Sequence, residues 1–254
     1  MNQILVTKKL YITPELKRKK KIYKFDFIIS IFLVCILTSL YIYAEYDRNK
    51  SEQTSQEILA DMNEILSENE SVDTTIAKDD ILLVVLDDTN GDDGNSLSSS
   101  AISSTNKQLE KKKTGDGYTY TTIATISIPK INLNYGIIRG ETGTPEEIES
   151  LLKISPTKYW GADPNEVGNF CVVGHNYRNS KFFSKVPTLV VGDTIEITDT
   201  SGRTIKYVVY DKYTVDPRDT SCTTQLTGGK KEVTLITCTN DSKQRVVVKT
   251  KEVK

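Results

Sequence analysis

The sequence predicts an all-β domain, of barrel or sandwich type, that follows a single transmembrane helix. Three observations carry this prediction. From Tyr118 onward, short runs rich in Val, Ile, Thr and Tyr alternate with turn residues, as strands of a half-buried sheet do. Residues 25–44 form an apolar run broken only by Asp26. Between the two, residues 45–117 are polar and acidic. The chain therefore divides into a tail (1–24), a span (25–44), a linker (45–117) and a β domain (118–254).

The apolar run has the length that a membrane-spanning helix needs, which is roughly 20 residues for a hydrocarbon core of about 30 Å. A cleaved signal peptide is the alternative, but its apolar region is shorter and ends in small residues. This run ends in LYIYA, with aromatic residues suited to a membrane interface, so an uncleaved anchor is favoured.

Basic residues dominate the tail, where Glu15 is the one acidic residue, so the positive-inside rule predicts that this tail is cytoplasmic. The basic residues are Lys8, Lys9, Lys17, Arg18, Lys19, Lys20, Lys21 and Lys24. Beside an apolar span, this run is read as an orientation signal and not as a nucleic-acid patch.

The linker holds 17 acidic residues against 7 Lys and Arg, and has few apolar side chains. Such a composition predicts a largely disordered extracellular segment, because too little apolar surface is available to offset the ordering entropy. Two stretches depart from it. Ile58, Leu59, Met62, Ile65 and Leu66 follow helical spacing and predict a short amphipathic helix. The run ILLVVL (81–86) predicts either a strand or a patch that docks on a partner.

The β domain contains candidate strands separated by turn signals such as Gly192-Asp193, Ser201-Gly202, Asp216-Pro217 and Gly228-Gly229. A helix is predicted only at 145–153, where Thr144 can cap, Pro145 takes the first position, and Glu146 and Glu147 suit the helix dipole. The predicted strands, in order, are 121–128, 133–138, 168–174, 194–198, 205–215, 232–238 and 245–250.

The cysteines do not form a disulfide framework. Cys35 lies in the span, so Cys171, Cys222 and Cys238 are outside the membrane, and an odd number leaves at least one thiol without a partner in this chain. A Cys171–Cys222 disulfide with Cys238 as a spare thiol is one arrangement that satisfies this count.

Three residues that can carry chemistry fall at predicted strand ends. His175 is the only histidine, and imidazole is the one side chain whose ordinary pKa, roughly 6.5, suits proton transfer near neutrality. Cys238 ends a strand where solvent can reach it. Arg245 opens the next strand seven residues later, which allows a short turn to bring it beside Cys238 as an antiparallel neighbour. A thiol nucleophile, a proton carrier and an oxyanion-stabilising cation together make an acyl-transfer site.

These residues resemble those of the sortases, which are Gram-positive, membrane-anchored cysteine transpeptidases, or thiol-peptidase-type hydrolases. The resemblance rests on the run TLITC (234–238) with Arg245 downstream and VGHN (173–176) upstream, and extends over the whole β domain. GNF (168–170), FF (182–183), VGDTI (191–195) and DPRDT (216–220) also stand where such domains place their counterparts. It implies a closed β-barrel of about eight strands. Without an extended lid or a long helical insertion, the sequence resembles the class D and class A-like group, and the subclass stays open.

The resemblance also implies roles. Cys238 would attack the Thr carbonyl of an LPXTG-like sorting signal, His175 would carry protons, and Arg245 would hold the substrate and stabilise the oxyanion. Thr237 is a weaker candidate for oxyanion support. The implied partners are surface proteins that carry the signal, an amine from a cell-wall precursor or a pilin Lys, and membrane lipid.

No cofactor and no nucleic-acid partner are expected, since no phosphate loop, acidic metal cluster or basic aromatic face occurs in the sequence. A regulatory calcium ion on Glu146, Glu147 and Glu149 is the alternative, and solvated helix residues are favoured over it. The competing function is an anchored, non-catalytic adhesin or receptor, in which Cys238 would be unreactive.

Overall fold

The computed structural model describes residues 14–75 and 110–253, and these form two units that meet between Lys50 and Ser51. The first unit is the N-terminal part of helix α1 (Pro14–Thr75), and the second holds the rest of α1 and the β domain. The predicted strand or patch at 81–86 lies outside the described residues, as does much of the predicted linker.

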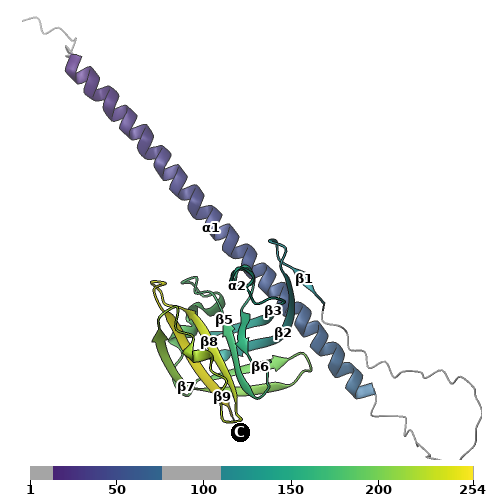
Figure 1. Ribbon diagram of the computed structural model, residues 1–254. Helices are drawn as coiled ribbons and strands as arrows, with labels where there is room; N and C mark the ends of the chain where they lie inside the picture. The colour runs from purple at the N-terminus through teal and green to yellow at the C-terminus, as the bar shows by residue number, and fades with distance from the viewer. Residues whose placement is uncertain (1–13, 76–109, 254) are drawn as a thin grey trace, which may run out of the picture. The chain divides into compact units, whose positions relative to one another are not determined.

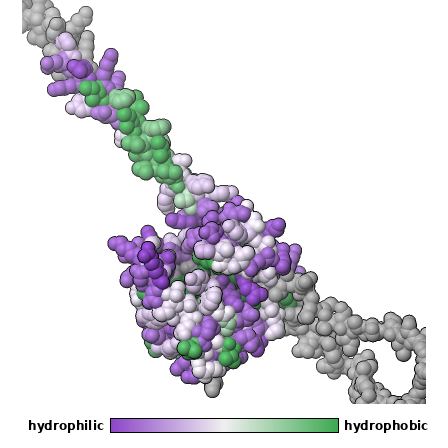
Figure 2. Space-filling view, viewed as in Figure 1, coloured by the Kyte–Doolittle hydropathy of each residue, from purple (hydrophilic) through white to green (hydrophobic). Residues whose placement is uncertain are grey.

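Helix α1 contains the whole predicted span and continues beyond it at both ends. The helix is long and apolar enough to cross a membrane. Large apolar side chains of the span, such as Phe32 and Leu37, are exposed along it. Figure 2 shows a hydrophobic band on α1. A helix that is apolar all round buries those side chains in lipid or in protein.

The second part of α1 differs from the expectation of a largely disordered linker, because residues 51–67 are helical and pack on the β domain. We call residues 51–67 the docked segment. Its apolar side chains repeat at helical spacing, and Ile58, Leu59 and Met62 are buried, so tertiary burial supplies the stabilisation that composition alone does not. Ile58 packs with Tyr120 of the β domain and with Leu151. The amphipathic helix predicted around Ile58 is therefore present, as part of a longer helix.

The β domain is a closed barrel of eight strands, β2 to β9. A ninth strand, β1, is only two residues long and pairs with β2. Neighbouring strands follow the order β1-β2-β3-β4-β5-β8-β9-β7-β6, and pairing of β2 with β6 closes the barrel. The pairs β3–β4 and β5–β8 are parallel and the others are antiparallel, so the barrel is mixed. Figure 1 shows β8 and β9 side by side on the wall of the barrel. The strands are Lys112–Lys113 (β1), Thr119–Ile128 (β2), Leu133–Gly140 (β3), Thr157–Gly161 (β4), Gly168–Val173 (β5), Thr194–Asp199 (β6), Thr204–Val215 (β7), Lys231–Cys238 (β8) and Arg245–Glu252 (β9).

Apolar side chains of every barrel strand except β4 meet in one core. Its fully buried members include Ile126, Phe170, Ile197, Leu235 and Val248. The short helices cover the ends and sides: α2 (Pro145–Leu152) and the 3-10 turns Pro129–Ile131, Phe182–Thr188 and Ser221–Thr223. The predicted cap of α2 is confirmed, because the Thr144 side chain accepts a hydrogen bond from the backbone N–H of Glu147 at 3.3 Å.

Strand β4 is absent from the sequence prediction. It has five residues, TKYWG, with no alternation of apolar and polar side chains. A register shift between Lys158 and Trp160 in its pairing with β5 interrupts the two-residue period. Lys158 is nevertheless held in place by an ion pair with Asp163 at 2.6 Å. Such a strand is specified by its neighbours and not by its own pattern.

Candidate active site

Cys238 and Arg245 stand directly opposite each other on the antiparallel pair β8–β9. They are the last aligned pair of that ladder, at the end next to the connecting turn. Directly opposite residues have Cα atoms about 4.5–5.5 Å apart and place their side chains on the same face of the sheet. The seven-residue spacing thus forms the hairpin that the sequence predicted, and it brings the thiol and the guanidinium together.

His175 lies on the other side of Cys238. Strands β5 and β8 are parallel, and each β5 residue pairs with the β8 residue 63 positions later, as in Gly168 with Lys231 and Val173 with Ile236. The pairing continues past the end of β5, because the backbone N–H of Gly174 donates to the carbonyl of Ile236 at 3.1 Å. The same offset places His175 level with Cys238. The three predicted residues are therefore in register, with His175 just past the end of β5, Cys238 at the end of β8 and Arg245 at the start of β9, and we call them the candidate row.

The backbone around His175 is fixed by close packing. A side chain on Gly174 would begin 2.5 Å from the ring of Phe183, so only glycine allows that ring to lie against the strand end. The backbone N–H of Phe183 in turn donates to the carbonyl of His175 at 3.0 Å. The residues between His175 and Phe183 are thus a closed loop whose two ends are hydrogen-bonded.

The loop that carries His175 is tied to the turn that follows Cys238. The side-chain amide of Asn176 donates to the carbonyl of Cys238 at 2.9 Å and to the Asn240 side chain at 3.0 Å. Arg178 donates to the hydroxyl of Ser242 at 2.9 Å. These bonds hold the His175 and Cys238 segments at a fixed separation, and Asn176 is a contributor that the sequence analysis did not single out.

Thr237 is buried and takes part in the same junction. Its hydroxyl donates to the carbonyl of Gly174 at 2.8 Å, so its one donor hydrogen is already used. Because successive side chains of a strand alternate, Thr237 also lies on the opposite face of β8 from Cys238. This geometry fastens β8 to the end of β5, whereas the oxyanion support predicted from the resemblance requires a donor aimed at the substrate.

Burial lowers the pKa of His175 below its ordinary value, because the charged imidazolium loses hydration. The positive charges of Lys153 and Arg245 lower it further. Glu149 on α2 acts in the other direction, with its carboxylate 3.9 Å from Nε2 of His175. The imidazole is consequently neutral in most molecules at neutral pH, and its protonated form is favoured chiefly by Glu149.

Replacing Glu149 by Gln is expected to lower the pKa of His175 further, since the substitution removes the negative charge that stabilises the imidazolium. His175 is the only histidine, so its ring protons give one unambiguous NMR titration curve in the untagged protein. Glu146→Gln, on the same helix, is the matched control. An unchanged or raised His175 pKa in Glu149→Gln would contradict this electrostatic account.

The other two cysteines of the β domain are buried: Cys171 lies on β5 and Cys222 in the β7–β8 connection. Cys222 packs with Ile236 and Val247, and Cys171 is fully buried. All four cysteines are free thiols, so the Cys171–Cys222 disulfide is not formed. Burial raises the pKa of both buried thiols, that of Cys171 to about 12, which keeps them in the unreactive protonated form. Cys238 is the partly exposed thiol of the β domain.

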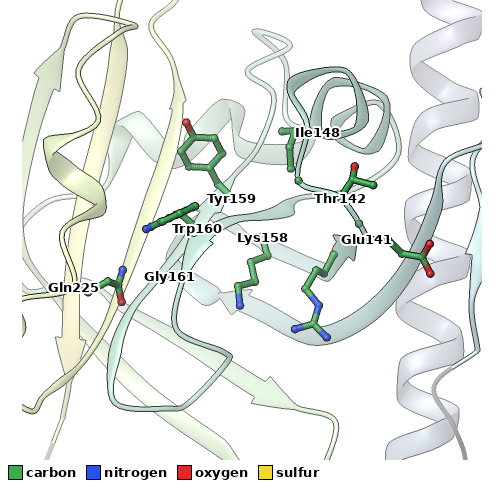
Figure 3. A pocket seen from close by; sticks show the side chains of 11 residues that line it. Glu141, Thr142, Ile148, Lys158, Tyr159, Trp160, Gly161 and Gln225 are labelled. Atoms are coloured by element: carbon green, nitrogen blue, oxygen red, sulfur yellow. The ribbon is translucent and has the colours of Figure 1, made fainter.

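A cavity of about 470 Å³ is lined by none of the three residues of the candidate row. It is lined by the β3–α2 turn, by β4 and by Gln225 of the β7–β8 connection, and Figure 3 shows Trp160 and Gln225 on one side and Thr142 and Ile148 on the other. Trp160 pairs with Cys171 on β5, four residues before His175, which is roughly 13 Å along a strand. The sequence analysis missed this exposed indole because it lies on the unpredicted strand β4.

The acidic residues of α2 have separate surroundings. The Glu147 carboxylate is buried and accepts backbone N–H groups of Glu141, Thr142 and Gly143 at 2.6–3.0 Å. These bonds lower the pKa of Glu147 against the opposing effect of burial. Glu147 therefore closes the β3–α2 turn, and Glu149 faces His175. Within residues 14–75 and 110–253, no three His, Cys, Asp or Glu side chains gather as a metal site.

Residues 126–253 match the family model of the sortase domain, and the chain belongs to the sortase family. Sortases are cysteine transpeptidases. Among solved structures, the chain is similar to a Clostridium perfringens sortase D5 transpeptidase, with 32% identity over 53% of this chain and 80% of that one, at a TM-score of 0.45. It is also similar to sortase C-1 of Actinomyces oris (26% identity, 52% and 73% covered, TM-score 0.45) and to a lid mutant of sortase A of Corynebacterium diphtheriae (26%, 59% and 74%, 0.45). No curated protein sequence matches the chain.

Proposed function

We propose that this sortase is a membrane-anchored transpeptidase that cleaves an LPXTG-like sorting signal at Cys238 and joins the released protein to an amine. The observation that supports the proposal is the candidate row, in which His175 follows the end of β5 and Arg245 opens β9, the two strands that pair with β8 on either side of Cys238. His175 and Arg245 are far apart in the sequence. Their convergence on one thiol at an open strand end is what acyl transfer requires.

In the first half-reaction, the Cys238 thiolate attacks the carbonyl carbon of the signal's Thr. The carbonyl electron pair moves to oxygen, and the Arg245 guanidinium stabilises this oxyanion. When the oxyanion collapses, the C–N bond to the following residue breaks, and His175 gives its proton to the departing amine. A thioester between Cys238 and the Thr remains, and the cleaved C-terminal peptide leaves.

In the second half-reaction, an incoming primary amine attacks the thioester. His175, now neutral, accepts the proton of the attacking nitrogen, and the C–S bond breaks to restore the thiolate. The lowered pKa of His175 supports its use as this base. The same shift makes the reactive pair of thiolate and imidazolium a minor species, which is what the sortase resemblance implies. The amine comes from a cell-wall precursor or from a pilin Lys.

We further propose that α1 spans the cell membrane once, with the basic tail in the cytoplasm and the barrel outside. The support is the excess of Lys and Arg before the apolar run and of acidic residues after it. In this position the barrel meets secreted proteins as they emerge. A protease applied to intact cells should cleave the β domain and spare the tail; digestion of the tail instead would contradict this orientation.

An acyl-enzyme trapped on Cys238 tests the proposed chemistry directly. The full chain, held in detergent, is incubated with a library of LPXTG-like peptides and without an amine, and intact-mass analysis follows. We expect a mass increase equal to the peptide up to its Thr, located on Cys238 by peptide mapping and discharged by added amine. If no peptide of the library gave an acyl-enzyme, or if the added mass were located on Cys171 or Cys222, the proposed function would be excluded.

Replacement of Arg245 should show whether its guanidinium stabilises the oxyanion. We expect Arg245→Ala to lower kcat by about 10²–10³-fold, the usual cost of removing one oxyanion donor. Arg245→Lys should recover only part of the loss, because it keeps the charge and loses the planar donor geometry. Arg203→Ala, in the β6–β7 turn, is the matched control and should keep its activity. An Arg245→Ala enzyme at the wild-type kcat would remove Arg245 from the mechanism.

A further inference from the structure

The docked segment is fastened to the barrel by polar contacts as well as by burial. Gly136 of β3 makes room for Ile58, because a side chain there would begin 2.7 Å from Cγ2 of Ile58. The hydroxyls of Ser55 and Ser155 are 3.3 Å apart in the buried interface, and Asp61 forms an ion pair with Lys112 of β1. The segment is therefore an integral layer of the catalytic unit.

One contact of this layer leads toward the active site. Both carboxylate oxygens of Glu52 accept the hydrogen of the Tyr135 hydroxyl, at 3.0 and 2.9 Å. The Tyr135 oxygen in turn accepts the backbone N–H of Phe182 at 3.0 Å. Burial raises the pKa of the Tyr135 hydroxyl, and Glu52 raises it further, so the hydroxyl keeps the proton that it donates. Tyr135 thus joins the docked segment to the far end of the His175 loop.

Phe182 is held in a conformation that needs such support. Its φ is +49°, a left-handed backbone angle that a bulky aromatic residue adopts only where its surroundings impose it. Its ring is buried and stacks on the ring of Tyr135, with centroids 5.2 Å apart. The hydrogen bond that Phe182 donates to the Tyr135 oxygen and the stacking of the two rings therefore act together on this one strained residue.

From Phe182 the contacts continue to the imidazole. The Tyr177 ring packs edge-on against Phe182 at 5.3 Å, and its centroid is 5.1 Å from that of His175. The N–H of the next residue, Phe183, holds the His175 carbonyl. The imidazole ring and the backbone of His175 are thus both supported from the strained turn at Phe182.

We propose that Glu52 is a positioning residue for His175, and that it acts through Tyr135 and the strained turn at Phe182. Glu52 touches none of the reacting groups, so its effect passes through the loop. This inference rests on the proposed function, in which His175 is the proton carrier. It means that the chain segment seven residues beyond the predicted span completes the active site, and that release of the docked segment would lower the activity of an otherwise folded barrel.

The test compares Glu52→Ala, Glu52→Gln and Tyr135→Phe in the full chain, in detergent. We expect Glu52→Ala to lower kcat by about tenfold or more, since small misplacements of catalytic groups are costly, with KM for the sorting peptide little changed. Glu52→Gln keeps an oxygen that can accept from Tyr135 and should recover most of the rate. Tyr135→Phe should be at least as slow as Glu52→Ala, because it also removes the acceptor of the Phe182 N–H, and the double variant should be no slower than Tyr135→Phe, because both changes break one path.

The lone imidazole supplies a readout that does not depend on turnover. We expect the His175 NMR signal of Glu52→Ala to shift and broaden and its titration midpoint to change, whereas Glu64→Ala, a matched change at an exposed site of the same segment, should leave signal and rate as in the wild type. A Glu52→Ala protein that melts earlier yet keeps the wild-type kcat and His175 signal overturns the proposal. If the wild type proves inactive on every sorting peptide, the proposed function fails, and the His175 signal still decides whether Glu52 positions the imidazole.

Discussion

Cys238→Ala is expected to abolish transpeptidation and to leave the barrel folded. The substitution removes the sulfur that would form the thioester, and the other two thiols of the β domain are not accessible: Cys171 and Cys222 are buried with raised pKa values. Cys238 is at a strand end and partly exposed, so the change in the free energy of unfolding should be about 1 kcal/mol or less. Product formation from a sorting peptide and an amine, measured beside a thermal melt, checks both halves of the expectation.

Cys222→Ala is the matched control for this variant. It removes a thiol of the same domain that packs against Ile236 and Val247, and we expect some loss of stability with full activity in the folded protein. A brief treatment with iodoacetamide should then label Cys238 ahead of Cys171 and Cys222, with label on Cys35 distinguished by peptide mapping. Residual transpeptidation by pure Cys238→Ala would mean that another residue is the nucleophile, and the proposed mechanism would then be wrong.

The strands that could be predicted from sequence are those with one face on the core and one on solvent. Strand β6 is the clearest case, because its buried and partly exposed residues alternate along its whole length. Strand β4 could not be predicted, since its bulge and its ion-paired Lys158 hide the period. Helix α1 beyond the span was also underestimated. Its docked segment is stabilised by the surface of β3, which lies 66 or more residues away along the chain and contributes nothing to local composition.

Part of the candidate site could likewise be predicted from the sequence, and part could not. The neighbourhood of Cys238 and Arg245 follows from a seven-residue spacing, because a short hairpin allows few registers. The parallel pairing of β5 with β8 joins segments 63 residues apart, so His175 was placed near Cys238 only through the family resemblance. Asn176 belongs to the run VGHN and Glu149 to the acidic residues of the predicted helix, but their contacts at the site, like that of Glu52, could not be predicted. Each of these contacts joins separate elements of the fold.

His175→Ala should be the second most damaging single change. General acid–base catalysis contributes about 10²–10⁴-fold, and both half-reactions draw on the same imidazole, so we expect kcat for peptide substrates to fall by at least about 10²-fold. The chain holds no second histidine that could substitute for it. The fold should survive, because the loop is held by the backbone carbonyl of residue 175 and by Asn176, which the substitution leaves in place. Steady-state kinetics with a sorting peptide and a melting curve measure the two effects.

The leaving group separates the loss of His175 from a general disruption of the site. A thioester or activated ester of the same peptide has a leaving group that departs without a proton, so acylation of His175→Ala by such a substrate should approach the wild-type rate. Cys238→Ala should not be acylated by either substrate. Added imidazole should restore part of the turnover of the amide substrate by His175→Ala. If the activated ester were as slow as the amide, His175 would be acting on the thiol or on the structure of the site, and not as the acid that releases the amine.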